Sequence, residues 1–237
     1  MSLLNNATIV LFICHVLGDF QLQSQLLTDM KMKSLIALAK HLLIHALTLT
    51  VVPITLLGWY SFFELWALIL FVWLSHCLVD IAKFYLNRTT GLTEETLYLT
   101  DQFLHIGMIF LLSEYIFSTE LALNFVSLNS LKWLLLLLVI TKPANITFKI
   151  VFQRFQYRTD ATTVPGAGAI IGNLERILSA IFLGMNQITA IGFIYTAKSI
   201  ARFKEIENHK GFAEYYLIGT LFSILYVMVA YFLIVVF

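Results

Sequence analysis

The sequence contains few charged residues, and this scarcity limits the classes of protein to which the chain can belong. Asp, Glu, Lys and Arg make up 12% of the 237 residues, 59% are hydrophobic, and the mean hydropathy is +0.86. A soluble domain has about 25% charged and about 45 to 50% apolar residues, so most side chains here must face lipid. The formal net charge is only +1, and the sequence has no basic cluster interleaved with aromatics, which argues against nucleic acid as a partner. The sequence therefore predicts an integral membrane protein.

Cysteine is scarce as well. The only two, Cys14 and Cys77, lie in apolar runs, so a disulfide framework is excluded. Each is adjacent to a histidine, but neighbours on a helix point about 100° apart, so we interpret both thiols as packing residues, with metal ligation as the alternative. The first twenty residues lack the cationic segment and small-residue cleavage site of a signal peptide, and we interpret them as the first membrane span.

Seven apolar runs approach or exceed the length of about 20 residues that a membrane helix needs. They predict helices at 3–23, 34–57, 61–86, 98–118, 131–150, 170–197 and 213–237. The polar stretch GMNQ at 184–187 favours a helical hairpin over 170–206 in place of one long span. The expected fold is all-α, a polytopic transmembrane helical bundle of seven to eight membrane helices that forms a single integral membrane domain over residues 1–237.

The basic residues between the predicted helices indicate an orientation. Alternate loops carry them, at Lys31, Lys33, Arg88, Arg154 and Arg158, while the loops near 53–60 and 118–130 carry none. Lys and Arg favour the cytoplasmic side, so we expect the N-terminus outside. A hairpin at 184–187 also keeps the later basic residues in the cytoplasm.

Four of the predicted helices each contain a pair of ligand-type residues at positions i and i+4. The pairs are His15 and Asp19, His41 and His45, His76 and Asp80, and Asp101 and His105. Residues four apart lie on one helix face. The first and third pairs come near the ends of their helices and the other two near the starts, so an up-and-down bundle places all four in one layer. The sequence predicts that these eight side chains converge on one centre.

A divalent cation explains such a cluster. A charged side chain at mid-bilayer costs at least about 2.5 to 3.5 kcal/mol, which coordination to a metal would offset. Imidazole and carboxylate ligands favour zinc, with manganese or iron as alternatives, and eight ligands suffice for one or two ions. For any single pair, a simple polar contact between helices is the alternative interpretation.

Two cations near the expected centre suggest an anionic substrate. Lys83 follows Asp80 by three residues, and Arg176 falls near the start of a helix on the same expected side. Metal and cations together stabilise charge on a phosphoryl oxygen, so we expect Lys83 and Arg176 to neutralise the substrate. Contact with lipid headgroups is the alternative for both.

Several motifs together carry a family resemblance: HVLGDFQLQ, HCLVDIAK, DQFLH, NLERIL and AKSIARF. With these motifs the chain resembles, over nearly its whole length, a family of bacterial multi-pass membrane proteins classified only as a domain of unknown function. The resemblance implies a bacterial inner-membrane protein and no activity. The use of His and Asp on membrane helices is also similar to membrane-embedded metal-dependent hydrolases, although the sequence lacks their best-known local motifs and H-E-x-x-H.

The leading hypothesis is a membrane-embedded metal-dependent hydrolase that acts on a lipid or lipid-linked phosphate near the cytoplasmic membrane surface. One of Asp19, Asp80 and Asp101 would take the proton from metal-bound water. The first alternative is a transporter or channel for a divalent metal or protons, although the far halves of these helices offer few polar residues. The second is a non-catalytic assembly protein in which the metal only holds the bundle together.

Overall fold

In the computed structural model the chain is helical and divides into two compact units. The structure describes all residues except 1–3, 57–61, 117–122, 124 and 158–165. One unit comprises Met1–Leu138 with Phe237, and the other comprises Val139–Val236. The single membrane domain expected from the sequence stays a prediction.

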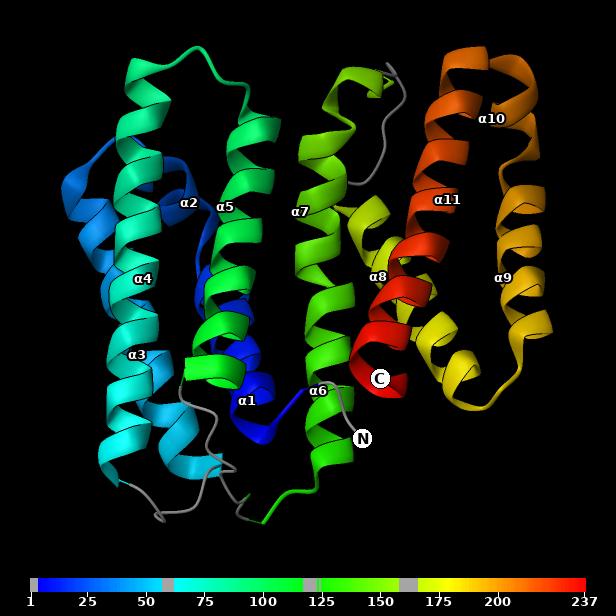
Figure 1. The fold of residues 1–237 in the computed structure, drawn as a ribbon. Helices are drawn as coiled ribbons and strands as arrows, with labels where there is room; N and C mark the ends of the chain where they lie inside the picture. Colours follow the sequence, from blue (N-terminus) through cyan, green and yellow to red (C-terminus); the bar gives the residue numbers. More distant parts are fainter. Residues whose placement is uncertain (1–3, 57–61, 117–122, 124, 158–165) are drawn as a thin grey trace. The chain divides into compact units, whose positions relative to one another are not determined.

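The first unit is built around four helices that carry the predicted ligand pairs. Its elements are α1 (Asn6–Val16) with the π-helical turn η1 (Leu17–Gln21), α2 (Gln25–Lys31), α3 (Leu35–Leu56), α4 (Phe62–Thr89), α5 (Glu94–Phe110) with η2 (Leu111–Ile116), and most of α6 (Leu128–Ile140). Helix α1 packs against α3 and α5, and α4 packs against both as well. Figure 1 shows α4 and α5 running side by side in this unit. The four helices therefore enclose a common interior.

Side-chain caps set where two of these helices begin. The Asn5 side chain accepts a hydrogen bond from the Thr8 amide at the start of α1, and the Thr93 side chain does the same for Thr96 at the start of α5. Hydropathy placed the second start at residue 98 instead of Glu94, because the first turn of α5 is charged although it is helical. The cap, and not the apolar run, decides the start.

Helix α2 lies in a segment that the sequence analysis assigned to a loop. The Ser24 side chain accepts a hydrogen bond from the Leu27 amide and so caps its start. The axis of α2 is bent by 92° from the helix formed by Asn6–Gln21. The chain therefore turns sharply after α1 and brings Lys31, the last residue of α2, back into the interior, where it is buried.

The second unit is also helical. Its elements are α7 (Lys142–Val151), η3 (Gln153–Phe155), α8 (Ala167–Gly184), α9 (Ile188–Ala201), α10 (Phe203–Asn208), α11 (Lys210–Tyr231) and η4 (Phe232–Val236). Helix α8 packs against α7, α9 and α11. The break between α8 and α9 falls at 185–187, where Asn186 has a φ of 58°, so the predicted bend in GMNQ is confirmed.

Several helices have the length and apolar character of membrane spans. Among the described residues, five helices qualify, and a sixth qualifies if Asn6–Gln21 and Gln25–Lys31 count as one broken span. Helices α5 and α9 are shorter, with 17 and 14 residues. The described helices therefore suit a helical bundle in a membrane, and these candidate spans alone do not reach the predicted seven to eight.

Candidate metal centre

The eight predicted ligand residues come together in one buried cluster in the first unit. Helix α1 with η1, α3, α4 and α5 each contribute one pair. None of the eight residues is more than 9% exposed. Their ligand atoms form three overlapping groups in which all atoms lie within 4.8 Å of one another: His15, Asp19, His45 and His76; His41, His76 and Asp80; and Asp19, Asp101 and His105. The predicted convergence is confirmed.

Two imidazole nitrogens and two carboxylate oxygens at the centre lie within 3.6 Å of one another, nitrogen to nitrogen and nitrogen to oxygen. The Nε2 atoms of His41 and His76 lie 3.4 Å apart. Asp80 Oδ2 lies 3.0 and 3.6 Å from these two nitrogens, and Asp19 Oδ1 lies 3.4 and 3.5 Å from them. Ligands at about 2.0 to 2.2 Å from a tetrahedral zinc ion are about 3.3 to 3.6 Å apart. We call these four residues the ligand core.

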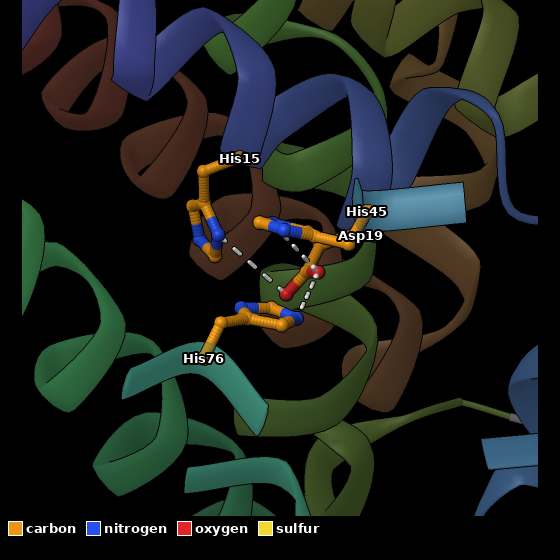
Figure 2. A group of neighbouring side chains, drawn as sticks. All are labelled: His15, Asp19, His45 and His76. Atoms are coloured by element: carbon orange, nitrogen blue, oxygen red, sulfur yellow. Dashed lines mark ion pairs between the residues drawn. The ribbon is translucent and has the colours of Figure 1, made fainter. Parts of the chain in front are cut away.

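Three further imidazoles surround the ligand core. Figure 2 shows His15, His45 and His76 arranged around the Asp19 carboxylate. His15 Nδ1 lies 3.8 Å from Asp19 Oδ2, and His45 Nε2 lies 4.0 Å from Asp19 Oδ1. His105 Nε2 lies 4.0 Å from Asp80 Oδ1. These longer distances suit either ligands of a second ion or groups that orient the ligand core.

Many polar atoms of the cluster lack a hydrogen bond. Within the part of the chain that the structure describes, the buried atoms without one include His15 Nδ1, Asp19 Oδ1, His41 Nδ1, both ring nitrogens of His45, Asp101 Oδ1 and His105 Nε2. More than about 90% of buried polar groups in proteins find a partner. These unsatisfied atoms are concentrated in one place, and imidazole nitrogens and carboxylate oxygens are ligand types that fit a cation.

Hydrogen bonds outside the centre fix the tautomers of two imidazoles. His15 Nε2 lies 3.3 Å from Gln102 Oε1, and His105 Nδ1 lies 2.9 Å from the carbonyl oxygen of Asp101. Each of these ring nitrogens must carry the proton to make its bond, which leaves the other nitrogen with a free lone pair. Both rings therefore present a ligand atom toward the cluster.

Lys83 contacts the cluster through Asp101. Its Nζ lies 2.8 Å from Asp101 Oδ2, which also accepts a hydrogen bond of 3.1 Å from Gln102 Nε2. The sequence analysis expected Lys83 to neutralise a substrate, and that role stays a prediction. What the structure gives is an ion pair that orients a carboxylate of the cluster.

The backbone around Asp19 has a special form. Asp19 lies in the π-helical turn η1, and such turns often mark functional sites because the wider turn re-aims a side chain. At the neighbouring Gly18, an added Cβ would lie 2.7 Å from His45 Cδ2. Glycine therefore allows η1 to approach α3 closely enough for Asp19 and His45 to share the centre.

Two residues outside the four pairs contact the cluster through their side chains, and the position of one of them was not predicted. Lys31 was assigned to a loop, yet its Nζ lies 3.5 Å from His41 Nε2. Gln102 was expected either to hydrogen-bond the ligands or to make a polar contact between helices, and it joins His15 to Asp101. Ser24, an N-cap residue followed by helix formers, was the available signal that Lys31 ends a helix.

Arg176 lies on α8 in the second unit. Its guanidinium donates hydrogen bonds to the carbonyl oxygen of Ile140, to the side-chain oxygens of Asn145 and Asn173, and to Ser223 Oγ. These partners all belong to the second unit. The expected contact between Arg176 and a substrate stays a prediction.

Cys14 is buried, as its expected packing role requires, whereas Cys77 is half-buried. The Cys14 thiol is buried and donates to the Thr48 carbonyl oxygen at 3.5 Å. Within the described ranges, neither Cys14 nor Cys77 belongs to a group of residues with metal-ligand spacing.

A family model described as "Protein of unknown function (DUF3307)" matches residues 7–136. The match contains all eight cluster residues and the motifs HVLGDFQLQ, HCLVDIAK and DQFLH, whereas NLERIL and AKSIARF lie outside it. The resemblance to an uncharacterised family is therefore confirmed over residues 7–136, and over the rest of the chain it stays an expectation. No curated protein and no solved structure matches the chain.

Proposed function

We propose that this chain, which belongs to the DUF3307 family of proteins of unknown function, is a membrane-embedded metal-dependent hydrolase acting on a lipid or lipid-linked phosphate near the cytoplasmic membrane surface. The observation that carries the proposal is the ligand core, in which both imidazole nitrogens lie 3.0 to 3.6 Å from both carboxylate oxygens. Two imidazole nitrogens and two carboxylate oxygens favour zinc first, then manganese or iron, as one or two ions.

The surrounding residues have complementary roles in hydrolysis. A bound divalent cation supplies a water nucleophile at neutral pH and polarises a phosphoryl oxygen. Asp101 is the best-oriented carboxylate to accept the proton of that water, because Lys83 and Gln102 hold its Oδ2 while its Oδ1 has no hydrogen bond within the described chain. Asp19 and Asp80, by contrast, face the two core imidazoles.

The polar cluster lies near one end of its four helices, and this position favours an enzyme over a channel. Buried apolar side chains occupy the next turns of each helix away from the cluster: Val10, Leu11, Leu49, Leu68 and Leu112. At the far end of α1, Thr8 Oγ1 and the Asn5 amide both donate to Glu114 Oε1, so these polar groups bind one another. Asn5 and Asp19 are about 20 Å apart along the helix. A conducting path would need polar groups across that distance.

The proposed topology keeps the cluster at the cytoplasmic face. Adding α1 with η1, α5 with η2, and α9 to the five long apolar helices gives eight crossings. Lys33 and Arg88 lie at the cluster end of the first unit, where Arg88 donates to the Lys33 carbonyl oxygen. Basic residues favour the cytoplasmic side, so the N-terminus is outside, in a bacterial inner membrane.

The test is metal analysis followed by activity on purified protein in detergent. We expect bound metal, and turnover with members of a panel of phosphorylated lipids, in the wild type. His76→Ala and Asp80→Ala should lose both metal and turnover, because each removes a ligand of the core. His209→Ala is the matched control, since His209 is exposed and lies outside the cluster.

Three results would contradict the hydrolase. They are unchanged turnover in both variants, a metal-loaded wild type inactive on the whole panel, and uptake of labelled metal into vesicles without hydrolysis. Uptake would favour a transporter. Bound metal with neither activity would favour an assembly protein.

A further inference from the structure

Lys31 brings a positive charge to the ligand core from outside the four ligand pairs. It ends α2 and is 8% exposed. Its Nζ lies 3.5 Å from His41 Nε2, the nitrogen that also faces Asp80 Oδ2 at 3.0 Å. A buried ammonium is costly unless it has a partner, so its position beside a candidate metal ligand requires an explanation.

A count of the charges around the centre shows how the Lys31 ammonium affects the net charge when a cation binds. Lys83 already pairs with Asp101. A divalent cation in the ligand core would balance the two remaining carboxylates, those of Asp19 and Asp80. Lys31 is then surplus, so the metal-loaded centre has a net positive charge and attracts an anion.

Lys31 and a metal ion also compete for one atom. The lone pair of His41 Nε2 can accept from the ammonium or bind the metal, but it cannot do both. The four-carbon stem of lysine is flexible enough to turn the ammonium away while leaving it beside the ion. A phosphoryl oxygen bound to the metal would then satisfy both cations.

We propose that Lys31 binds the phosphoryl group of the anionic substrate at the metal-loaded centre, which makes it a substrate-binding residue of the site. The inference rests on the proposed function and deepens it, because it names the group that the enzyme recognises. Recognition of the substrate's negative charge is thereby assigned to α2. The 92° bend after α1 orients this helix so that Lys31 is buried, whereas Lys33, two residues later, is exposed.

The experiment measures the binding of inorganic phosphate to the metal-loaded full chain in detergent, by calorimetry. The variants are Lys31→Ala and Lys31→Arg, with Lys33→Ala as the matched control on the same segment. We expect Lys31→Ala to keep its metal and to bind phosphate at least about tenfold more weakly, the loss typical of one charged hydrogen bond. Lys31→Arg should keep most of the affinity, and Lys33→Ala all of it.

Kinetics separate this inference from the proposed function. With a phosphorylated lipid as substrate, Lys31→Ala should raise KM more than it lowers kcat. Equal phosphate affinity in Lys31→Ala and the wild type would overturn the inference, and so would loss of metal from Lys31→Ala or no phosphate binding by the metal-loaded wild type. Phosphate binding that depends on Lys31 in a protein without turnover would support the inference and refute the hydrolase.

Discussion

The two units bury charged groups in opposite ways. In the first, three carboxylates and five imidazoles meet, and many of their atoms have no hydrogen bond among the described residues. In the second, Arg176 is 3% exposed, yet its guanidinium donates to four oxygen atoms, all of them neutral. The cluster of the first unit therefore lacks hydrogen-bond partners, whereas the Arg176 guanidinium of the second unit has them.

This difference in hydrogen bonding distinguishes a polar cluster suited to binding a ligand from one with a structural role. A buried network with every donor paired rigidifies a fold and needs nothing more. A buried cluster whose polar atoms lack hydrogen-bond partners is destabilising unless a ligand supplies those partners. By this criterion the cluster of the first unit has the character of a binding site, and the cation proposed for it would supply the missing partners, whereas Arg176 holds together α8, α7, α11 and the end of α6.

Removal of the metal should produce the largest difference in stability between the two units. A chelator should destabilise the first unit, because a ligand present at about 1,000 times its Kd contributes about 4 kcal/mol to folding. Hydrogen exchange read by mass spectrometry should rise in α1, α3, α4 and α5 and stay constant in α7, α8 and α11. Re-addition of zinc should restore the protection. Equal exchange with and without chelator would show that the cluster holds no stabilising metal.

The second prediction concerns Arg176→Leu. The change removes the Arg176 donor from the Ile140 carbonyl oxygen and from Asn145 Oδ1, while Asn173 Oδ1 keeps its bond from Asn145 Nδ2, so we expect a loss of about 2 to 4 kcal/mol in unfolding free energy. Denaturation in detergent measures it, with Arg202→Leu, at a largely exposed side chain, as control.

Metal content of Arg176→Leu distinguishes the two interpretations of this residue. A structural role predicts unchanged metal content and unchanged phosphate affinity per folded molecule. If the variant is as stable as the wild type but binds phosphate more weakly, Arg176 contacts the anion, as the sequence analysis expected.

The metal-type cluster was predictable from the sequence because its signal is local and rare. A pair such as His76 and Asp80 stands out in an apolar helix, and the spacing of four alone places both residues on one face. The position of each pair near one end of its helix then predicted that the four pairs meet in one layer. Hydropathy and one polar stretch were likewise enough to predict most helices and the bend near Asn186.

The parts that were missed depend on contacts between elements distant in the sequence. Lys31 lies in a polar segment without an apolar period, so nothing local showed that α2 would carry it to His41. The environment of Arg176 was equally hidden, because its acceptors Ile140 and Asn145 precede it by 36 and 31 residues. The π-helical turn at Asp19 leaves no pattern that separates it from an α-helix.

Gly18→Ala should have the smallest effect, and it tests how tightly the first unit is built around its centre. The new Cβ would lie 2.7 Å from His45 Cδ2, so α3 or the imidazole must shift by several tenths of an ångström. Overpacking of this kind costs about 1 to 3 kcal/mol, and we expect metal affinity to fall by about tenfold as His45 and Asp19 separate. Gly107→Ala on α5 is the control, because a Cβ there meets nothing within 4 Å and alanine favours the helix. If metal titration gives equal affinities for both variants, the centre tolerates displacement of His45, and that imidazole is not a ligand.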